Sequence, residues 1–153
     1  GSAADAQHIA TEFISRFYQE RPGLNAEALS VNTSTLTAIG NDYSFARVFA
    51  RQLEAKGREG DMVLGLSTSG RSQNVLEALW YAREHGIITA LLMGGFENPE
   101  LEGAADYIIK VPSLITPRIQ EAHIFIGHVL AEYVEFKMFG QKHMEKKGSV
   151  EVW

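Results

Sequence analysis

Residues 62–72 read MVLGLSTSGRS, an apolar run that passes directly into a polar loop. The run from Met62 to Leu66 lies between polar turns, which is typical of a strand buried on both faces of a parallel sheet. After the loop, apolar residues recur at helical spacing and predict a helix over 73–85. A strand, a polar loop and a helix in this order form the unit from which parallel α/β sheets are built.

The flanking segments carry the same two patterns, apolar runs for strands and helically spaced apolar residues for helices. They predict further elements in this order: a helix over 3–18, a short strand over 26–31, a helix over 44–56, strands over 87–93 and 107–111, and a long helix over 118–138. Strands that alternate with helices form a parallel sheet covered on both faces. The sequence therefore predicts one three-layer, doubly wound α/β domain over residues 1–140, followed by a tail over 141–153.

The composition limits the classes of function that the chain can have. Its 153 residues have room for one domain with one core. The formal net charge of −5 argues against binding to nucleic acid, because a duplex-binding protein usually carries a clustered basic face. The sequence contains no cysteine, which excludes thiol catalysis and fits a reducing cytoplasm, and its apolar runs are too short to span a bilayer. We expect a cytoplasmic protein that binds neither membranes nor nucleic acid.

The polar loop at 67–72 has the properties of a phosphate site. Ligands of parallel α/β sheets bind at the carboxyl ends of the strands, where this loop lies. Gly70 allows close approach of the backbone, and the following helix offers unpaired N–H groups. Ser72 could instead be only a helix N-cap, but a cap explains one hydroxyl residue among four. We predict that the phosphate of a monoester is bound by Ser67, Thr68, Ser69 and Ser72.

Two predicted helices carry polar side chains that could perform chemistry. His8 and Glu12 lie four residues apart, so they share a helix face and could bind a metal or act as acid and base. The same spacing is common on a solvated helix face. The long helix carries four further candidates: Gln120, Glu121, His123 and His128. Gln120 lies about 80° from His128 around the helix axis, whereas Glu121 lies closer to the direction of His128. Spacing alone therefore does not decide whether Gln120 or Glu121 acts together with His128.

Four motifs, in order along the chain, resemble the sugar isomerase (SIS) domain family and, within it, the sedoheptulose 7-phosphate isomerases. The motifs are GSAADAQHIATE at 1–12, TAIGNDY at 37–43, STSGRS at 67–72, and RIQEAH at 118–123 with the later His128. The resemblance extends from residue 1 to about residue 140. It implies an SIS fold whose central first strand would precede Gly1, so that 1–140 would be an N-terminally incomplete SIS domain.

The resemblance also implies roles for individual residues. It implies that Glu12 and His128 are the catalytic acid–base pair. It implies substrate contacts, besides the serine loop, from Ser2, Asn41, Asp42 and Gln120. It further implies a zinc ion bound by His8, Glu12, Gln120 and His128.

Two positions depart from the family pattern. Pro117 stands where some members carry an Asp that contacts a sugar hydroxyl, and Arg71 stands where the loop often has Asn. The contact to that sugar hydroxyl is therefore not expected in this chain.

The activity that the resemblance implies is aldose–ketose isomerisation. Sedoheptulose 7-phosphate would become D-glycero-D-manno-heptose 7-phosphate through an enediol intermediate, for ADP-heptose and lipopolysaccharide core synthesis. The enzyme would be a homotetramer with sites at subunit interfaces. The alternative is a non-catalytic SIS relative, either an assembly factor that binds a replication initiator or a sugar-phosphate sensor. The presence of His8, Glu12 and His128 together favours the enzyme, since a scaffold has no need for them.

Overall fold

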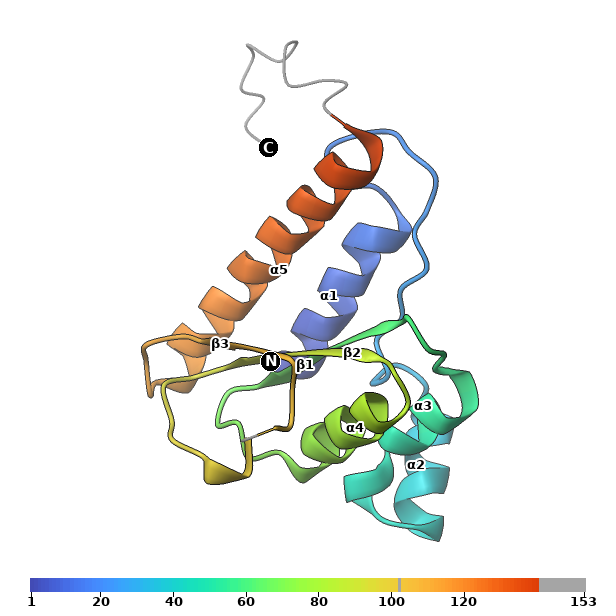
Figure 1. Ribbon diagram of the computed structural model, residues 1–153, viewed down its shortest axis with the longest axis vertical. Helices are drawn as coiled ribbons and strands as arrows, with labels where there is room; N and C mark the ends of the chain where they lie inside the picture. Colours follow the sequence, from blue (N-terminus) through green and yellow to red (C-terminus); the bar gives the residue numbers. More distant parts are fainter. Residues whose placement is uncertain (102, 141–153) are drawn as a thin grey trace.

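A parallel sheet of three strands lies at the centre of the computed structural model, which describes residues 1–101 and 103–140 (Figure 1). Its strands are β1 (Met62–Ser67), β2 (Ile88–Met93) and β3 (Tyr107–Lys110), paired in the order β1-β2-β3. Met62 is in register with Ile88, and Ala90 with Tyr107. The three strands predicted around 62–66, 87–93 and 107–111 are confirmed. The predicted tail over 141–153 lies outside the described residues.

Helices cover both faces of the sheet. On one face lies α4 (Gln73–Glu84), and on the other α1 (Ser2–Ile14) and α5 (Thr116–Phe139) run side by side (Figure 1). The short elements η1 (Phe45–Arg47) and α3 (Ala50–Lys56) pack against α4, α2 (Thr33–Asp42) packs against η1, and η2 (Pro99–Leu101) follows β2. The prediction of a three-layer α/β domain is thus confirmed. None of the helices in the described ranges has both the length and the apolar character needed to cross a bilayer.

The main apolar core lies between α4 and the sheet. Leu76 and Leu79 of α4 pack against Leu91 and Met93 of β2, and all four side chains are almost fully buried. β2 is covered on both faces, as its apolar run predicts. β1 is buried at Gly65 and Ser67, whereas Met62 at its start is exposed. The prediction of complete burial is therefore wrong for the first half of β1, which pairs on one side with β2 and on the other with no described strand.

The N-terminal third of the chain differs most from the sequence prediction. The helix predicted over 3–18 ends at Ile14, because the backbone N–H groups of residues 17–19 donate to the Glu135 side chain instead of to helix carbonyls. The strand predicted over 26–31 is irregular chain, in which the Leu29 carbonyl accepts a hydrogen bond from Gln52 Nε2 at 2.9 Å. The single helix predicted over 44–56 is divided into η1 and α3.

α2 was not predicted. It begins at Asn32, whose side chain accepts a hydrogen bond from the Thr35 N–H at 3.0 Å and so caps the helix. Ile39 is its buried residue, so the segment carries no stripe of apolar side chains from which a helix could be predicted.

Candidate active site

The serine loop brings together hydroxyl groups from the end of β1 and the start of α4. Ser67 Oγ lies 2.9 Å from Ser72 Oγ, and Ser67 is only 3% exposed. Ser72 occupies the N-cap position of α4, but its side chain makes no capping hydrogen bond within the described chain. The first N–H groups of α4 thus open beside four hydroxyl residues. Unpaired helix N–H groups favour an anion, because they carry the positive end of the helix dipole.

The backbone of the loop is held by the chain that follows β2. The carbonyl of Thr68 accepts from the Gly94 N–H at 2.9 Å, and the carbonyl of Gly70 accepts from Asn98 Nδ2 at 2.7 Å. Gly70 has a φ of 67°, a conformation that favours glycine, and a Cβ there would lie 2.6 Å from Met93 Cε. The loop is therefore fixed in shape mainly by its backbone, and Ser69 Oγ adds to this by accepting a hydrogen bond from the Arg71 N–H at 3.2 Å.

A second cluster of polar side chains lies between α1 and α5. His8 Nε2 is 3.2 Å from Glu12 Oε1 and 3.1 Å from His128 Nε2. The neighbouring pair Ile9 and Gly127 explains this approach, since a Cβ at Gly127 would lie 2.5 Å from Ile9 Cδ1. The missing side chain lets the two helices come close, and His8 and His128 are the adjacent residues.

The donor atoms of this cluster suit a zinc ion. One ligand atom each from His8, Glu12 and His128 lies within 4.8 Å of the other two. Two His and one Glu form a typical donor set for catalytic zinc, and two nitrogens bound to one tetrahedral zinc would be roughly 3.3 Å apart. The 3.1 Å between the two Nε2 atoms is close to that value. Three of the four residues that the resemblance implies as zinc ligands therefore fit this metal.

Gln120, the fourth predicted ligand, lies about two turns before His128, near the start of α5. Its side-chain amide packs against the α-carbon of Gly1, where a Cβ would overlap it. The eight residues to His128 correspond to about 12 Å along the helix. The structure thus groups Gln120 with Gly1 and Ser2 at the start of α1, and groups His128 with His8.

Glu121, which spacing could not distinguish from Gln120, points away from this region. Its carboxylate pairs with Arg118 at 2.6 Å, and both side chains are exposed. Glu121 therefore belongs to the solvated face of α5.

The serine loop and the start of α5 meet at the carboxyl edge of the sheet. A Cβ at Gly94 would lie 2.5 Å from Ile119 Cδ1 and 2.7 Å from the Thr68 carbonyl oxygen. Ile119 precedes Gln120, so the loop, the Gln120 amide and the histidine cluster follow one another along the α1–α5 pair. This arrangement offers a phosphate site at one end and acid–base groups at the other.

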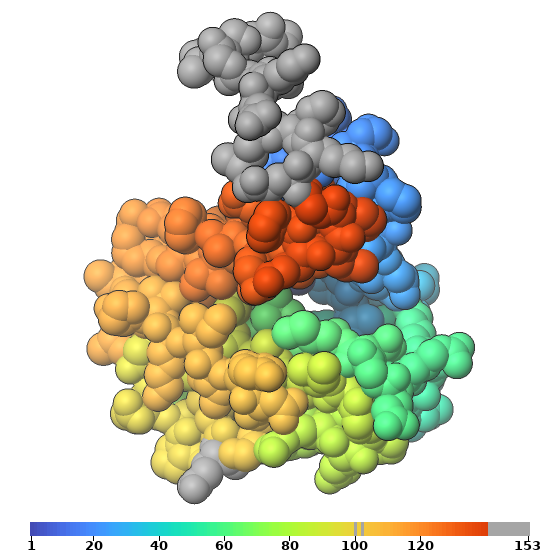
Figure 2. Space-filling view, turned by 45° about the horizontal axis from the view of Figure 1, so that its top comes forward, coloured from blue at the N-terminus to red at the C-terminus, as the bar shows by residue number. Residues whose placement is uncertain are grey.

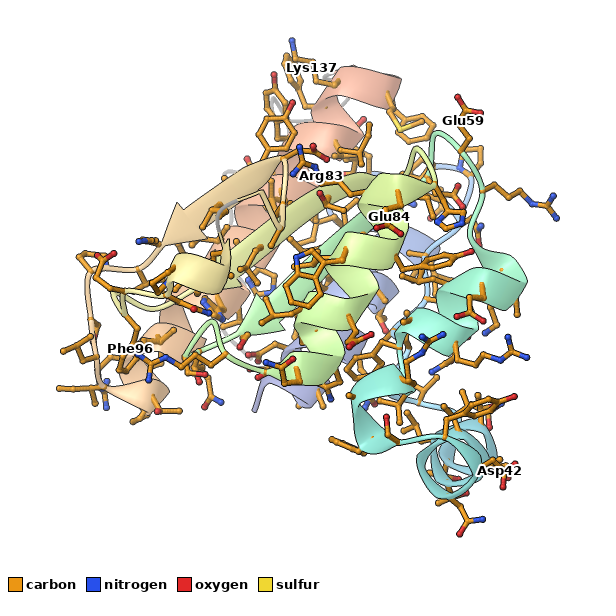
Figure 3. The ribbon with its side chains drawn as sticks, turned by 60° about the horizontal axis from the view of Figure 1, so that its bottom comes forward. Asp42, Glu59, Arg83, Glu84, Phe96 and Lys137 are labelled. Carbon is orange, nitrogen blue, oxygen red and sulfur yellow. The ribbon has the colours of Figure 1, made fainter. Side chains whose placement is uncertain are left out.

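Asn41 and Asp42 are not brought to this region of the chain. They lie at the end of α2, exposed, with Asn41 Nδ2 3.1 Å from Asp42 Oδ1. Asp42 and the loop that carries Phe96 lie on opposite sides of α4 (Figure 3). Within one chain, these two predicted substrate contacts are therefore separate from the serine loop.

His123 lies inside the molecule, on the α5 face that packs toward the sheet. It is fully buried, and neither ring nitrogen has a hydrogen-bond partner among the described residues. Burial lowers the pKa of His123, while the Met93 carbonyl and the Asp5 carboxylate oppose that shift. The ring is therefore kept neutral, which suits a packing role.

Comparisons with known proteins identify the family of this chain. The SIS domain family matches residues 1–94. A phosphoheptose isomerase of Aneurinibacillus thermoaerophilus is 54% identical over 147 residues, which cover 96% of this chain and 74% of that protein. Phosphoheptose isomerase 2 of Campylobacter jejuni is 54% identical over 141 residues, which cover 92% of this chain and 70% of that protein. The chain belongs to the phosphoheptose isomerase family.

Solved structures of phosphoheptose isomerases have the same fold. The structure from Francisella tularensis matches with a TM-score of 0.82 and 37% identity, over 87% of this chain and 71% of that chain. The structure from Neisseria gonorrhoeae matches with a TM-score of 0.79 and 41% identity, over 87% and 70%. The predicted SIS fold is thereby confirmed for this phosphoheptose isomerase family member.

Sequence reasoning missed one buried ion pair in this family member. Arg21 Nε lies 3.1 Å from Glu135 Oε1, and the two side chains are 3% and 2% exposed. The signal was present in α5, whose buried residues recur every fourth position: Ile119, His123, Gly127, Ala131 and Glu135. A carboxylate in such a stripe needs a partner.

Proposed function

We propose that the chain is a phosphoheptose isomerase that converts sedoheptulose 7-phosphate to D-glycero-D-manno-heptose 7-phosphate. The observation that carries this proposal is the cluster of His8, Glu12 and His128, in a chain 54% identical to a protein named phosphoheptose isomerase. A non-catalytic scaffold would have no use for three converging acid–base groups, so the assembly-factor and sensor alternatives are not favoured. The product would serve lipopolysaccharide core synthesis in the cytoplasm.

The serine loop would bind the substrate phosphate. Ser67, Thr68, Ser69 and Ser72 offer hydroxyl donors, and the start of α4 offers N–H groups. With the phosphate held there, the sugar chain would extend along Ser2 and Gln120 toward the histidine cluster. Such anchoring holds the reacting carbons in place, which lowers the entropic part of the barrier.

Glu12 and His128 would then move the protons. One of them removes a proton from C1 of the ketose while the carbonyl oxygen on C2 gains a proton, which gives the 1,2-enediol. The O1 hydroxyl then loses its proton as C2 gains one, which leaves the aldehyde at C1. Each positioned acid or base typically contributes on the order of 10²–10⁴-fold to the rate.

His8, Glu12 and His128 would hold a zinc ion, while Gln120, grouped with Gly1, would serve the substrate. When bound, zinc supplies Lewis-acid polarisation of a carbonyl or enediolate oxygen. A carboxylate bound to a metal is a weaker base, so Glu12 would act as ligand and as base in different states of the enzyme. His128 is a ligand in the same cluster, so it too would carry a proton only in the state without the metal.

The active form would be a homotetramer with sites between subunits. Asn41 and Asp42 lie apart from the serine loop of their own chain, so they would serve the site of a neighbour. α5 carries a row of exposed apolar side chains that a second subunit would cover: Phe125, Val129, Tyr133 and Phe136. Exposed apolar rows of this kind mark protein contacts.

Turnover of sedoheptulose 7-phosphate by the full chain tests the function, with aldose formation followed by proton NMR. The wild-type protein should form the aldose, and the His128→Ala variant should not. His85→Ala is the matched control, because His85 is an exposed histidine stacked on Tyr81 and remote from the cluster. No turnover by the folded wild-type protein would contradict the proposed function.

A further inference from the structure

The segment that follows α1 is irregular, yet its backbone is bound to one buried carboxylate. Glu135 Oε1 accepts the Phe17 N–H at 3.1 Å, and Oε2 accepts the N–H groups of Tyr18 at 2.8 Å and Gln19 at 3.1 Å. Arg21 Nε donates to Oε1 at 3.1 Å. Four donors thus occupy the lone pairs of a side chain that is 2% exposed. The space-filling view shows this N-terminal segment, in blue, against the red end of α5 (Figure 2).

The other side of the Arg21 guanidinium caps α1. Its Nη2 donates to the Glu12 carbonyl at 2.7 Å, and its Nη1 donates to the carbonyls of Phe13 at 2.6 Å, Ser15 at 3.2 Å and Pro22 at 3.2 Å. The last carbonyls of a helix have no partner within the helix and carry the negative end of its dipole. A buried cation therefore caps the end of α1, which lies at Ile14, two residues after Glu12.

Such a buried pair is not the obvious way to stabilise a fold. Removing two charges from water opposes their attraction, and well-packed apolar side chains in their place are often equally stable or more so. Apolar side chains, however, could not make the hydrogen bonds of this pair. Arg21 binds the carbonyls of Glu12 and Phe13, and Glu135 binds three backbone N–H groups. The planar fork of Arg21 and the two oxygens of Glu135 fix geometry in both directions.

The network is linked to each proposed acid–base residue, to Glu12 through its backbone and to His128 through Phe17. Arg21 holds the main chain of Glu12, whose carboxylate lies 3.2 Å from His8 Nε2. Glu135 holds the main chain of Phe17, whose ring centroid is 5.8 Å from that of the His128 ring.

Resting on the proposed isomerase function, we propose that Arg21 and Glu135 are positioning residues, which hold Glu12 and His128 in their catalytic arrangement. Glu135 and His128 are seven residues apart, almost two full turns of α5, so they share a face of that helix. The pair thus fixes the end of α1 and the Phe17 segment against the same face that presents His128.

Two variants separate positioning from stability. Arg21→Lys keeps the charge but has a single ammonium, which cannot reach Glu135 and the α1 carbonyls together. The double variant Arg21→Met with Glu135→Leu replaces the pair with apolar side chains and leaves no unpaired buried charge. Arg83→Lys is the control, because Arg83 pairs with Asp106 at 3.2 Å on a half-exposed surface away from the site.

The measurements are kcat, KM for sedoheptulose 7-phosphate, and thermal melting of the full chain. Both test variants should be folded at the assay temperature, with kcat lowered about tenfold or more and KM within about twofold, since displaced acid–base groups slow the proton transfers without loosening the phosphate. Arg83→Lys should keep the wild-type kcat. A wild-type kcat in both variants would overturn the proposal, and so would failure of both to fold, because the pair would then be purely structural.

If the wild-type protein itself had no isomerase activity, the proposed function would fail while the positioning remained testable. Crystal structures of the wild-type protein and Arg21→Lys would then be compared at the separation of His8 Nε2 and Glu12 Oε1. A displaced Glu12 carboxylate supports positioning by Arg21. An unchanged separation excludes it.

Discussion

His8 Nε2 lies 3.1 Å from His128 Nε2, although 120 residues separate the two in the sequence. At this distance the two nitrogens cannot both carry a hydrogen. At least one of them therefore presents a lone pair, either to the other nitrogen or to a shared cation. The Glu12 carboxylate adds a negative charge next to them. The arrangement therefore favours a divalent metal that accepts both imidazole nitrogens and the carboxylate at once.

Loss of one histidine should weaken zinc binding strongly. We expect the His8→Ala variant to bind Zn²⁺ at least about 10²-fold more weakly than the wild-type protein, because one of the two imidazole ligands of the cluster is removed. Isothermal titration calorimetry of the chelator-treated full chain measures the change. His85→Ala should keep the wild-type affinity, and equal affinities in all three proteins would exclude a zinc site at this cluster.

Replacement of the carboxylate should separate catalysis from substrate binding. We expect Glu12→Gln to lower kcat by about 10²-fold or more, because an amide cannot act as a base. The serine loop lies at the other end of the site, so the inhibition constant for inorganic phosphate should stay within about twofold. Steady-state kinetics with phosphate as inhibitor provide both values, and wild-type turnover in this variant would remove Glu12 from the mechanism.

The serine loop should control affinity more than rate. Ser72→Ala removes the hydroxyl that lies 2.9 Å from Ser67 Oγ and makes no capping bond. One hydrogen bond to a charged phosphate contributes about 1.5–3 kcal/mol, so we expect KM to rise about 10- to 100-fold with little change in kcat. A matched Ser34→Ala variant on the exposed face of α2 should keep the wild-type KM. An unchanged KM in Ser72→Ala would mean that this hydroxyl does not touch the phosphate.

The elements that could be predicted from the sequence are those determined by residues within their own segment. β2 and α4 follow from a five-residue buried run and from a helical stripe that includes Leu76 and Leu79. The end of α1 at Ile14 could not be predicted, because it depends on Glu135, which lies more than a hundred residues away. α2 escaped prediction because its stability comes from the Asn32 cap and not from an apolar stripe.

The candidate site divides in the same way. The serine loop could be predicted from composition and from its place after a strand, since both belong to one short segment. The histidine cluster could be proposed from spacing only as one of several options, because the α1–α5 contact at Ile9 and Gly127 decides which faces meet. That contact also separates Gln120 from Glu121, which the helical spacing left equivalent.

Acid should destabilise the protein in two separate steps. Burial lowers the pKa of His123 below its ordinary 6.5, so the unfolded chain binds the extra proton and stability falls as the pH drops below 6.5. Burial acts to raise the pKa of Glu135, but the hydrogen bonds from Tyr18, Phe17 and Arg21 outweigh it and lower the pKa below the ordinary 4.5. Its contribution is therefore present above pH 4.5 and is lost as the pH falls through the lowered value.

The first of these steps can be assigned with one variant. In His123→Leu the decrease of the melting temperature between pH 7.5 and pH 5.5 should be smaller than in the wild-type protein, because no buried imidazole remains to be protonated. His85→Ala should keep the wild-type decrease, since His85 is exposed. Equal decreases in wild-type and His123→Leu proteins would assign the step to other groups.

Two glycine substitutions should have opposite effects on stability. Gly127→Ala places a Cβ 2.5 Å from Ile9 Cδ1, where Ile9 is buried and the helices are in contact, so overpacking should destabilise the protein by about 1–3 kcal/mol. Gly40 lies inside α2, and a Cβ added there would meet no described atom within 4 Å, so Gly40→Ala should stabilise by up to about 1 kcal/mol through helix propensity. Urea unfolding of both variants measures these changes. Gly127 also sets the approach of His8 to His128, so Gly127→Ala should lose zinc affinity, whereas Gly40→Ala should keep it. If Gly127→Ala were destabilised but bound zinc with unchanged affinity, the cluster would not depend on this contact.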